Sequence, residues 1–261
     1  MSRLVAREGG VATVTLDRPA QRNALDESLK TALLDAVAEV GADESVRAVV
    51  LAAEGQAFCV GQDLAEHATA LSQGGPEAAF RTVEEHYSPI VEALATMPKP
   101  VVAAVNGTCV GAGLGLALAC DLRVFAEDAT LGTAFSGIGL TCDSGLSATL
   151  TRSVGESRAR ELVLLGATFT PADAVAWGIS GHVVARAEVD AAAAGLAARL
   201  AAGPTAAYAE SKRLLAGAFR RSLGETLAAE AEAQLRCGAT EDHRNAVEAF
   251  ISKARPTFAG R

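Results

Sequence analysis

The chain has 261 residues, a formal net charge of −8 and a hydrophobic share of one half. A chain of this length and composition can bury a large core within one domain. Its negative charge argues against a nucleic-acid partner, because binding to a phosphate backbone requires a basic surface.

The N-terminal segment MSRLVAREGG contains no apolar signal stretch, and the longest apolar runs are interrupted by glycine or charge. The sequence therefore predicts neither secretion nor a membrane span, and we expect a cytoplasmic protein. His182 and His243 have no partner at metal-ligand spacing, so we expect no metal site. Unevenly spaced cysteines in mostly apolar runs are typical of small buried side chains in a reducing compartment: Cys59, Cys109, Cys120, Cys142 and Cys237.

Short apolar runs alternate with helical patterns up to about residue 185. From Val189 onward the pattern is almost entirely helical, with a stop and restart at Gly203-Pro204. Thr170 followed by Pro171 predicts the N-cap and first position of a short helix without catalytic content. The expected strands are VATVTL, VRAVVLAA, PVVAAV, LRVFA and GHVV.

Two of these strands run into glycine-containing turns that precede helices. The strand Val46 to Leu51 leads to Gly61, and the strand Val101 to Val105 leads to a buried helix of small residues from Ala112 to Cys120. Amide N–H groups at the start of a helix lack intrahelical partners and lie at the positive end of its dipole. Close packing explains such a glycine-rich tract equally well when it stands alone. The second turn favours a site for an anionic atom, because two turns can direct two donors at one oxygen.

Four motifs occur in order along the chain: LDRPAQRNALD at 16–26, AFCVGQDL at 57–64, NGTCVGAGLGLALACDL at 106–122 and FSGIGLTCDSGLSATLTRSVG at 135–155. Together they resemble the crotonase, or enoyl-CoA hydratase/isomerase, superfamily from about Val11 to Phe258. The resemblance implies an α/β fold with a spiral of strand–strand–helix turns over 1–190. It also implies a C-terminal helical oligomerisation region over 191–261, which builds trimers that often pair into hexamers.

The resemblance further implies that the backbone N–H groups of Gln62 and Ala112 form an oxyanion hole for the thioester oxygen of an acyl-CoA. Removing a proton next to a thioester places negative charge on that oxygen. Preformed donors therefore stabilise the transition state more than the ground state. Hydratases of the family carry two glutamates, and the matching positions here are Gly115 and Phe135. Neither residue transfers protons, so ordinary hydration, which needs an acid and a base, is not expected.

Asp143 is the carboxylate that remains in this region. Apolar residues on both sides predict burial, which would raise its pKa toward a catalytically useful value. An N-cap role before Ser144-Gly145 is the structural alternative. The resemblance favours catalysis, because IGLTCDSG is similar to the segment in which double-bond and ring-opening isomerases of the superfamily carry their single aspartate.

One carboxylate is sufficient for a double-bond shift, since the same group can remove a proton from one carbon and return it to another. We therefore expect an acyl-CoA isomerase that moves a 3,4 double bond into conjugation or rearranges a ring-derived CoA thioester, in fatty acid metabolism or aromatic degradation. GQDL and LTCDSG resemble the 1,2-epoxyphenylacetyl-CoA isomerase type. The alternatives are a hydratase, hydrolase or lyase with Asp143 as base, and a non-catalytic acyl-CoA-binding homologue.

Further contacts are implied by the same resemblance. Arg22 and Lys253 are candidates for CoA phosphate binding, with Phe250 and Lys253 reaching the CoA of a neighbouring subunit; ordinary surface positions are the alternative. The remaining candidates for substrate contact are Ala24, Asp63, Leu64, Gly111 and Phe135, of which Asp63 also fits an N-cap. Coenzyme A would enter as part of the substrate, so we expect no separate cofactor.

Histidine and cysteine side chains are further candidates for the pocket. His67 and His86 lie on expected helical segments, and either could face the pocket mouth, although a surface or hydrogen-bonded histidine is the favoured interpretation. Cys142 has no histidine nearby in sequence to activate it, so a thiol nucleophile is not expected.

Overall fold

The computed structural model describes residues 4–261 and confirms the α/β class. Helices and strands alternate as far as β10, and helices follow it. In chain order the elements are β1 Val5–Glu8, β2 Val11–Leu16, η1 Pro19–Gln21, α1 Glu27–Ala42, β3 Ala48–Ala53, β4 Ala57–Cys59, α2 Leu64–Thr82, η2 Val83–Tyr87, α3 Ser88–Thr96, β5 Val101–Val105, β6 Thr108–Val110, α4 Ala112–Ala119, β7 Leu122–Ala126, β8 Leu131–Gly132, η3 Ser136–Ile138, α5 Leu146–Leu165, β9 Thr168–Phe169, α6 Pro171–Trp177, β10 His182–Val184, η4 Arg186–Glu188, α7 Val189–Ala201, α8 Thr205–Gly217, α9 Leu223–Gly238 and α10 Glu241–Ser252.

The larger sheet has the strand order β1-β2-β3-β5-β7-β10. Its strands pair in parallel except for the antiparallel hairpin of β1 and β2. All the expected strands lie in this sheet: β2 and β7 have the predicted bounds, and the others begin one or two residues later than predicted. The parallel order places the ends of β3 and β5 at the same edge, which brings the segments that follow them close together.

Alternate residues of the central strands face opposite sides of this sheet, as the pleat requires. Val49 and Leu51 of β3 belong to the main core, which is shared with α1, α3 and α4. Ala48 and Val50 belong to a second cluster under α7. Burial on both faces explains why these strands are continuous apolar runs without a polar alternation.

A smaller sheet has the order β4-β6-β8-β9, and its strands are interleaved along the chain with those of the larger sheet. In it β4 and β6 pair in parallel, with Ala57 opposite Thr108. Each strand is followed directly by one of the two glycine turns, at Gly61 and Gly111. The pairing of the short strands therefore sets the two turns side by side. This proximity is necessary if the two turns are to direct two donors at one oxygen.

Helix α7 lies within the range expected to form the C-terminal region, yet it packs on the larger sheet. Ala193, Ala197 and Ala201 are buried in the cluster that contains Val50 and Val102. The alanine-rich face of this helix is therefore covered by the sheet of the same chain. Small side chains allow α7 to lie close to the strands.

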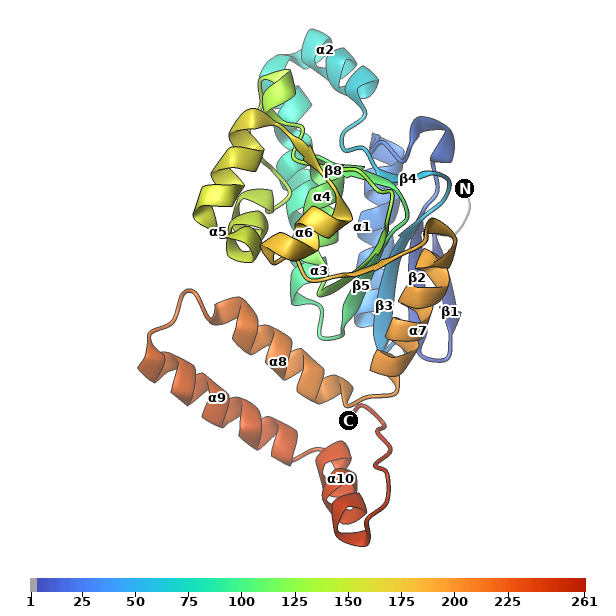
Figure 1. Ribbon diagram of the computed structural model, residues 1–261, viewed down its shortest axis with the longest axis vertical. Helices are drawn as coiled ribbons and strands as arrows, with labels where there is room; N and C mark the ends of the chain where they lie inside the picture. Colours follow the sequence, from blue (N-terminus) through green and yellow to red (C-terminus); the bar gives the residue numbers. More distant parts are fainter. Residues whose placement is uncertain (1–3) are drawn as a thin grey trace.

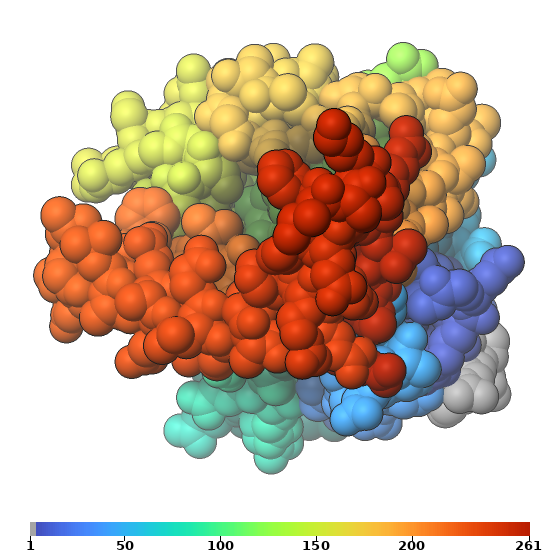
Figure 2. All heavy atoms as spheres, turned by 90° about the horizontal axis from the view of Figure 1, so that it is seen from below, coloured from blue at the N-terminus to red at the C-terminus, as the bar shows by residue number. Residues whose placement is uncertain are grey.

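The last three helices, α8, α9 and α10, form a group that stands apart below the rest of the molecule (Figure 1). Viewed from below, α8, α9 and α10 spread across one face of the molecule (Figure 2). The segment after α10 returns to the body, where Arg47 donates hydrogen bonds to the carbonyl oxygens of Gly203 and Phe258. Within residues 4–261 no helix is long and apolar enough to cross a membrane.

Candidate active site

Backbone hydrogen bonds fix the first glycine turn against Leu25, and the second glycine turn lies directly beside it. The Leu25 N–H donates to the Gly61 carbonyl at 2.8 Å, and the Asp63 N–H donates to the Leu25 carbonyl at 3.1 Å. A Cβ on Gly61, whose φ is +85°, would lie 3.4 Å from the backbone nitrogen of Ala112. Glycine at position 61 therefore permits both the left-handed backbone and the close approach of the second turn.

The backbone N–H groups of Gln62 and Ala112 are the unused donors at this junction. Leu25 bonds to the residues on either side of Gln62, so the Gln62 N–H points away from that strand pairing. Ala112 is the first residue of α4, where the N–H has no intrahelical partner. In the described part of the chain, neither group donates a hydrogen bond. Both amides therefore remain available to an external acceptor.

Asp143 is positioned by the packing of its turn against α4. A Cβ on Gly115 would lie 2.5 Å from the Cβ of Ser144 and 2.8 Å from its carbonyl oxygen. Glycine at position 115 is thus what allows the 143–145 turn to approach the helix so closely. The first position that carries a glutamate in hydratases has no room for any side chain here.

The N-cap alternative for Asp143 is wrong. Gly145 occupies the N-cap of α5, and no side chain caps that helix. The Asp143 carboxylate instead lines a cavity and accepts a 2.8 Å hydrogen bond from the Ser144 hydroxyl. Burial raises the pKa of Asp143, and the Ser144 hydrogen bond partly opposes this effect.

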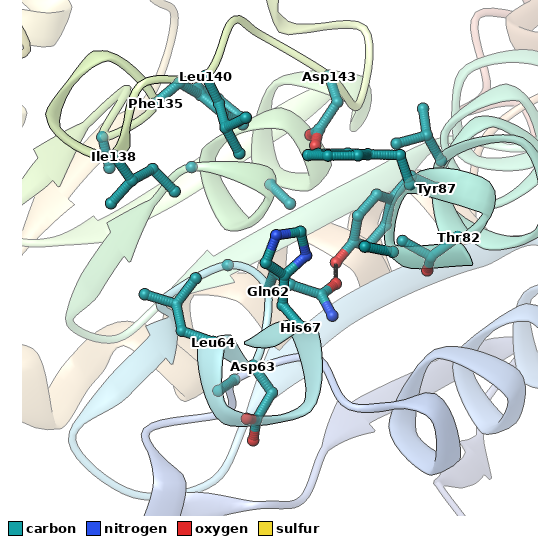
Figure 3. Close-up of a pocket in the computed structure, with 18 of the residues that line it drawn as sticks. Gln62, Asp63, Leu64, His67, Thr82, Tyr87, Phe135, Ile138, Leu140 and Asp143 are labelled. Carbon is teal, nitrogen blue, oxygen red and sulfur yellow. Dashed lines mark hydrogen bonds between the residues drawn. The ribbon is translucent and has the colours of Figure 1, made fainter. Parts of the chain in front are cut away.

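A cavity of about 390 Å³ opens between the two turns, α2 and the loop that carries Asp143. Its walls are mainly apolar. Figure 3 shows the Asp143 carboxylate and the His67 ring pointing into it from opposite sides in this view. The structure brings together at this cavity most of the predicted site residues: Ala24, Gln62, Asp63, Leu64, Gly111, Ala112, Phe135 and Asp143.

Asp63 and Phe135 contribute to the cavity in different ways. Asp63 caps α2 by accepting from the N–H groups of Ala65 and Glu66, and its other oxygen pairs with Arg18 at 2.7 Å. Its carboxylate is thus fully engaged, which confirms the N-cap interpretation. Phe135 is buried in the main core and presents its ring to the cavity. At this position the cavity wall is therefore apolar.

Tyr87 is a pocket residue that the sequence analysis missed. It lies in the π-helical turn η2, is buried, and donates a hydrogen bond to the side-chain Oε1 of Gln62 (Figure 3). Burial, followed by the charge of Asp143, raises the pKa of Tyr87. No motif in the sequence marks this tyrosine, because only the packing of η2 against the glycine turn gives it a role.

The two histidines of this region differ in their surroundings. His86 is buried, shares a hydrogen bond with Thr82 and lies 3.5 Å from a Glu27 oxygen. His67 is half-buried, lines the cavity and packs edge-on against Phe80, with ring centroids 5.1 Å apart. Within the described residues its ring nitrogens have no hydrogen-bond partner. The preference for a surface or hydrogen-bonded histidine therefore fails for His67 and holds for His86.

Three predicted CoA-binding residues lie outside this cavity. Arg22 is exposed and donates to the Thr108 hydroxyl at 3.0 Å. Phe250 is 84% exposed near the end of α10, and Lys253 is the exposed C-cap of the same helix. The single chain does not bring these two residues to its own cavity, so their role at a neighbouring subunit stays a prediction.

Cys142 is the cysteine next to Asp143 in the chain. Burial and the nearby Asp143 charge raise the pKa of Cys142, which disfavours its nucleophilic thiolate form. Within residues 4–261 no group of three or more histidine, cysteine, aspartate or glutamate side chains is arranged to hold a metal ion.

The family model for enoyl-CoA hydratase/isomerase matches residues 6–261. The 1,2-epoxyphenylacetyl-CoA isomerase of Escherichia coli is 35% identical over 97% of both chains. The 2,3-dehydroadipyl-CoA hydratase of the same organism is 32% identical over 99% of this chain and 98% of its own.

A crystal structure from Mycobacterium abscessus that carries an enoyl-CoA hydratase/isomerase name superimposes with a TM-score of 0.95. It is 51% identical, with coverage of 98% of this chain and 100% of that one. The superposition confirms the predicted crotonase-like fold with its C-terminal helices. By its motifs, its family-model match and its architecture, the chain belongs to the enoyl-CoA hydratase/isomerase family, the crotonase superfamily.

Proposed function

We propose that this enzyme is an acyl-CoA isomerase that shifts a double bond toward the thioester or rearranges a ring-derived CoA thioester. The thioester oxygen accepts hydrogen bonds from the backbone N–H groups of Gln62 and Ala112. Asp143 acts as the acid/base beside the α-carbon. The observation that carries the proposal is one cavity lined by both of these residues and by a half-buried carboxylate whose pKa is raised.

The chemistry follows from the charge that develops in the reaction. Asp143 removes the α-proton, and the electron pair of the broken C–H bond moves onto the thioester oxygen. The two amides stabilise that oxyanion, and loss of one such donor typically costs roughly 10²–10³ in rate. Protonation of the γ-carbon then completes the shift. A raised pKa suits this task, because a carboxylate that holds a proton more tightly is a stronger base.

Hydration is the second candidate, because a relative is named as a hydratase. The local structure favours isomerisation. Gly115 leaves no space for a glutamate, and Phe135 is buried with its ring in the cavity wall. Hydration would need a base that activates water on the side where these two residues lie.

Purified enzyme should be incubated separately with a 2-enoyl-CoA and with a 3-enoyl-CoA. We expect conversion of the 3-enoyl-CoA to the conjugated isomer without hydration of the 2-enoyl-CoA. Asp143→Asn should reduce isomerisation roughly 10²–10⁴-fold, the usual range for loss of a general acid–base group. Hydration of the 2-enoyl-CoA without isomerisation would reject the proposal. Acyl-CoA binding without turnover, unchanged in Asp143→Asn, would indicate a non-catalytic homologue instead.

We propose in addition that the chain assembles into trimers, or hexamers, through α8, α9 and α10. Large apolar side chains on these helices are strongly exposed, including Leu215 at 72%, Leu235 at 77% and Phe250 at 84%. Contiguous exposed apolar surface usually marks a protein contact. Assembly would cover these side chains and carry Phe250 and Lys253 toward the CoA of a neighbour. Cytoplasmic location remains our expectation from the sequence.

A further inference from the structure

We call the cavity of about 390 Å³ that Asp143 lines the acyl pocket. A second cavity, of about 460 Å³, adjoins it on the side of α2. The two cavities differ in character, since the acyl pocket is mainly apolar whereas charged side chains line the second. These side chains include Lys30, Glu66 and His86, and we call this space the polar cavity. The two spaces share a wall, because Gln62, His67, Ala79 and Thr82 line both of them.

His67 is the titratable residue of this shared wall. Among the titratable side chains of the described residues, it alone lines both cavities. The ring emerges from the first turns of α2 and points into the acyl pocket, across from the Asp143 carboxylate in this view (Figure 3). The ring packs against Phe80 at a steep interplanar angle of 69°.

The other charged groups of the polar cavity are engaged with one another. Lys30, which is almost fully buried, lies 3.2 Å from a Glu66 oxygen. The second Glu66 oxygen accepts a 2.8 Å hydrogen bond from the Glu27 backbone N–H. His86 pairs with Thr82 and Glu27. His67 is therefore the titratable group of the shared wall whose hydrogen-bonding atoms are uncommitted.

We propose that His67 is a second catalytic residue, which protonates the γ-carbon while Asp143 removes the α-proton. This inference rests on the proposed isomerase function and changes only the source of the returned proton. An imidazole can supply this proton because it readily gains and loses one near neutral pH. A group that lines both the closed pocket and the polar cavity can recover that proton from solvent.

The proton and electron balance is complete. Asp143 takes the C2 proton, and the C2–H electron pair becomes the new C2=C3 double bond by way of the enolate. The former C3=C4 pair forms the bond to the proton that His67 donates at C4. Neutral His67 then regains a proton from water in the polar cavity, and Asp143 releases its proton to solvent after the product leaves.

The source of the C4 hydrogen can be measured directly. A 3-enoyl-CoA with ordinary hydrogen should be converted in deuterated water, stopped at low conversion, and the product examined by NMR and mass spectrometry. For the wild type we expect solvent deuterium at C4 in nearly every turnover. For His67→Gln and His67→Phe we expect a rate lower by roughly 10²-fold. The hydrogen at C4 should then come mainly from C2 of the substrate, returned by Asp143.

The two variants separate catalysis from packing. Phenylalanine retains a ring against Phe80, and glutamine retains hydrogen bonding without proton transfer. His182→Gln is the matched control, because His182 is exposed on β10 and lines neither cavity. Substrate dissociation constants and circular dichroism should be close to wild type for all three variants. Complete inactivity of both His67 variants with intact folding and binding would also support the proposal.

Failure of this inference differs from failure of the proposed function. If wild-type product lacks solvent deuterium at C4, or if both His67 variants give the wild-type rate and label, His67 is not the donor while the isomerase assignment stands. If the wild type does not isomerise the substrate, or Asp143→Asn is fully active, the proposed function fails and this inference fails with it.

Discussion

The Tyr87 hydroxyl donates a hydrogen bond to Oε1 of Gln62, and the backbone N–H of that glutamine is one of the two free amides beside the acyl pocket. The other polar atom of the Gln62 side chain, Nε2, lies 3.4 Å from Oε1 of Glu66. A buried tyrosine in a π-helical turn and a helix residue thus hold the side chain from two sides. Such contacts restrict the orientation of the peptide that carries the proposed oxyanion donor.

Tyr87→Phe tests this restraint. The substitution removes the donor to Gln62 while keeping the ring that fills the pocket wall. A neutral hydrogen bond contributes about 0.5–1.5 kcal/mol. We therefore expect kcat of the isomerisation to fall by roughly 2–10-fold with KM little changed, because the restraint matters most when charge develops on the oxygen. Tyr208→Phe, on α8, is the control, and a wild-type kcat in Tyr87→Phe would contradict the role.

Gly115→Ala tests the close packing that positions Asp143. The new methyl group would lie 2.5 Å from the Ser144 Cβ, so the 143–145 turn must move. Overpacking of this kind costs about 1–3 kcal/mol in unfolding free energy. We expect that loss in chemical denaturation together with a large fall in isomerase rate.

Gly195→Ala is the matched control for this substitution. Gly195 lies within α7, and a Cβ there meets no heavy atom within 4 Å. Alanine in an open helical position is favoured over glycine by about 0.5–1 kcal/mol. The control should therefore be slightly stabilised and fully active. Equal stability and activity in both glycine variants would show that the Gly115–Ser144 contact does not constrain the site.

Asp143→Asn should separate activity from stability. Burial raises the pKa of Asp143 in the folded protein, so folding disfavours its charged form. The folded state consequently binds a proton more tightly than the unfolded state. Stability is lost as pH rises from the unfolded pKa through the raised folded pKa, and the loss persists at neutral pH.

At neutral pH we therefore expect Asp143→Asn to be roughly 10²–10⁴-fold less active yet at least as thermostable as the wild type. Thermal unfolding followed over a pH series should show that the advantage of the variant shrinks as the solution becomes more acidic and the wild-type carboxyl gains its proton. A variant that is less stable than wild type at neutral pH would mean that the charged carboxylate makes favourable contacts.

Leu235→Glu tests assembly through the C-terminal helices. Leu235 is 77% exposed on α9, so a charge there should leave the fold of the single chain intact but oppose burial in an interface. Sedimentation velocity should show trimers or hexamers for the wild type and smaller species for the variant. Leu164→Glu places the same charge at 74% exposure on α5, outside these helices, and should leave the assembly unchanged. A monomeric wild type would contradict the assembly proposal.

Local patterns predicted much of the architecture. The β2 and β7 bounds were predicted residue for residue, and the Thr170 capping box stands where Thr170 and Pro171 indicated it. These features depend on neighbours in the chain, so sequence alone contains their causes. The placement of α7 was not predicted, because an alanine-rich helix has the same composition whether it covers a sheet or a neighbouring subunit.

The candidate site was likewise predicted only in part from the sequence. The sequence by itself determined that two glycine turns follow apolar strands, that Gly115 and Phe135 cannot transfer protons, and that Asp143 is the carboxylate left between apolar segments. Only the tertiary structure decided that Asp143 lines the pocket and does not cap α5. It also revealed Tyr87 behind Gln62 and placed His67 between two cavities. Those relationships join segments that are distant in the chain, and they arise from how the helices pack on the sheets and not from any local pattern.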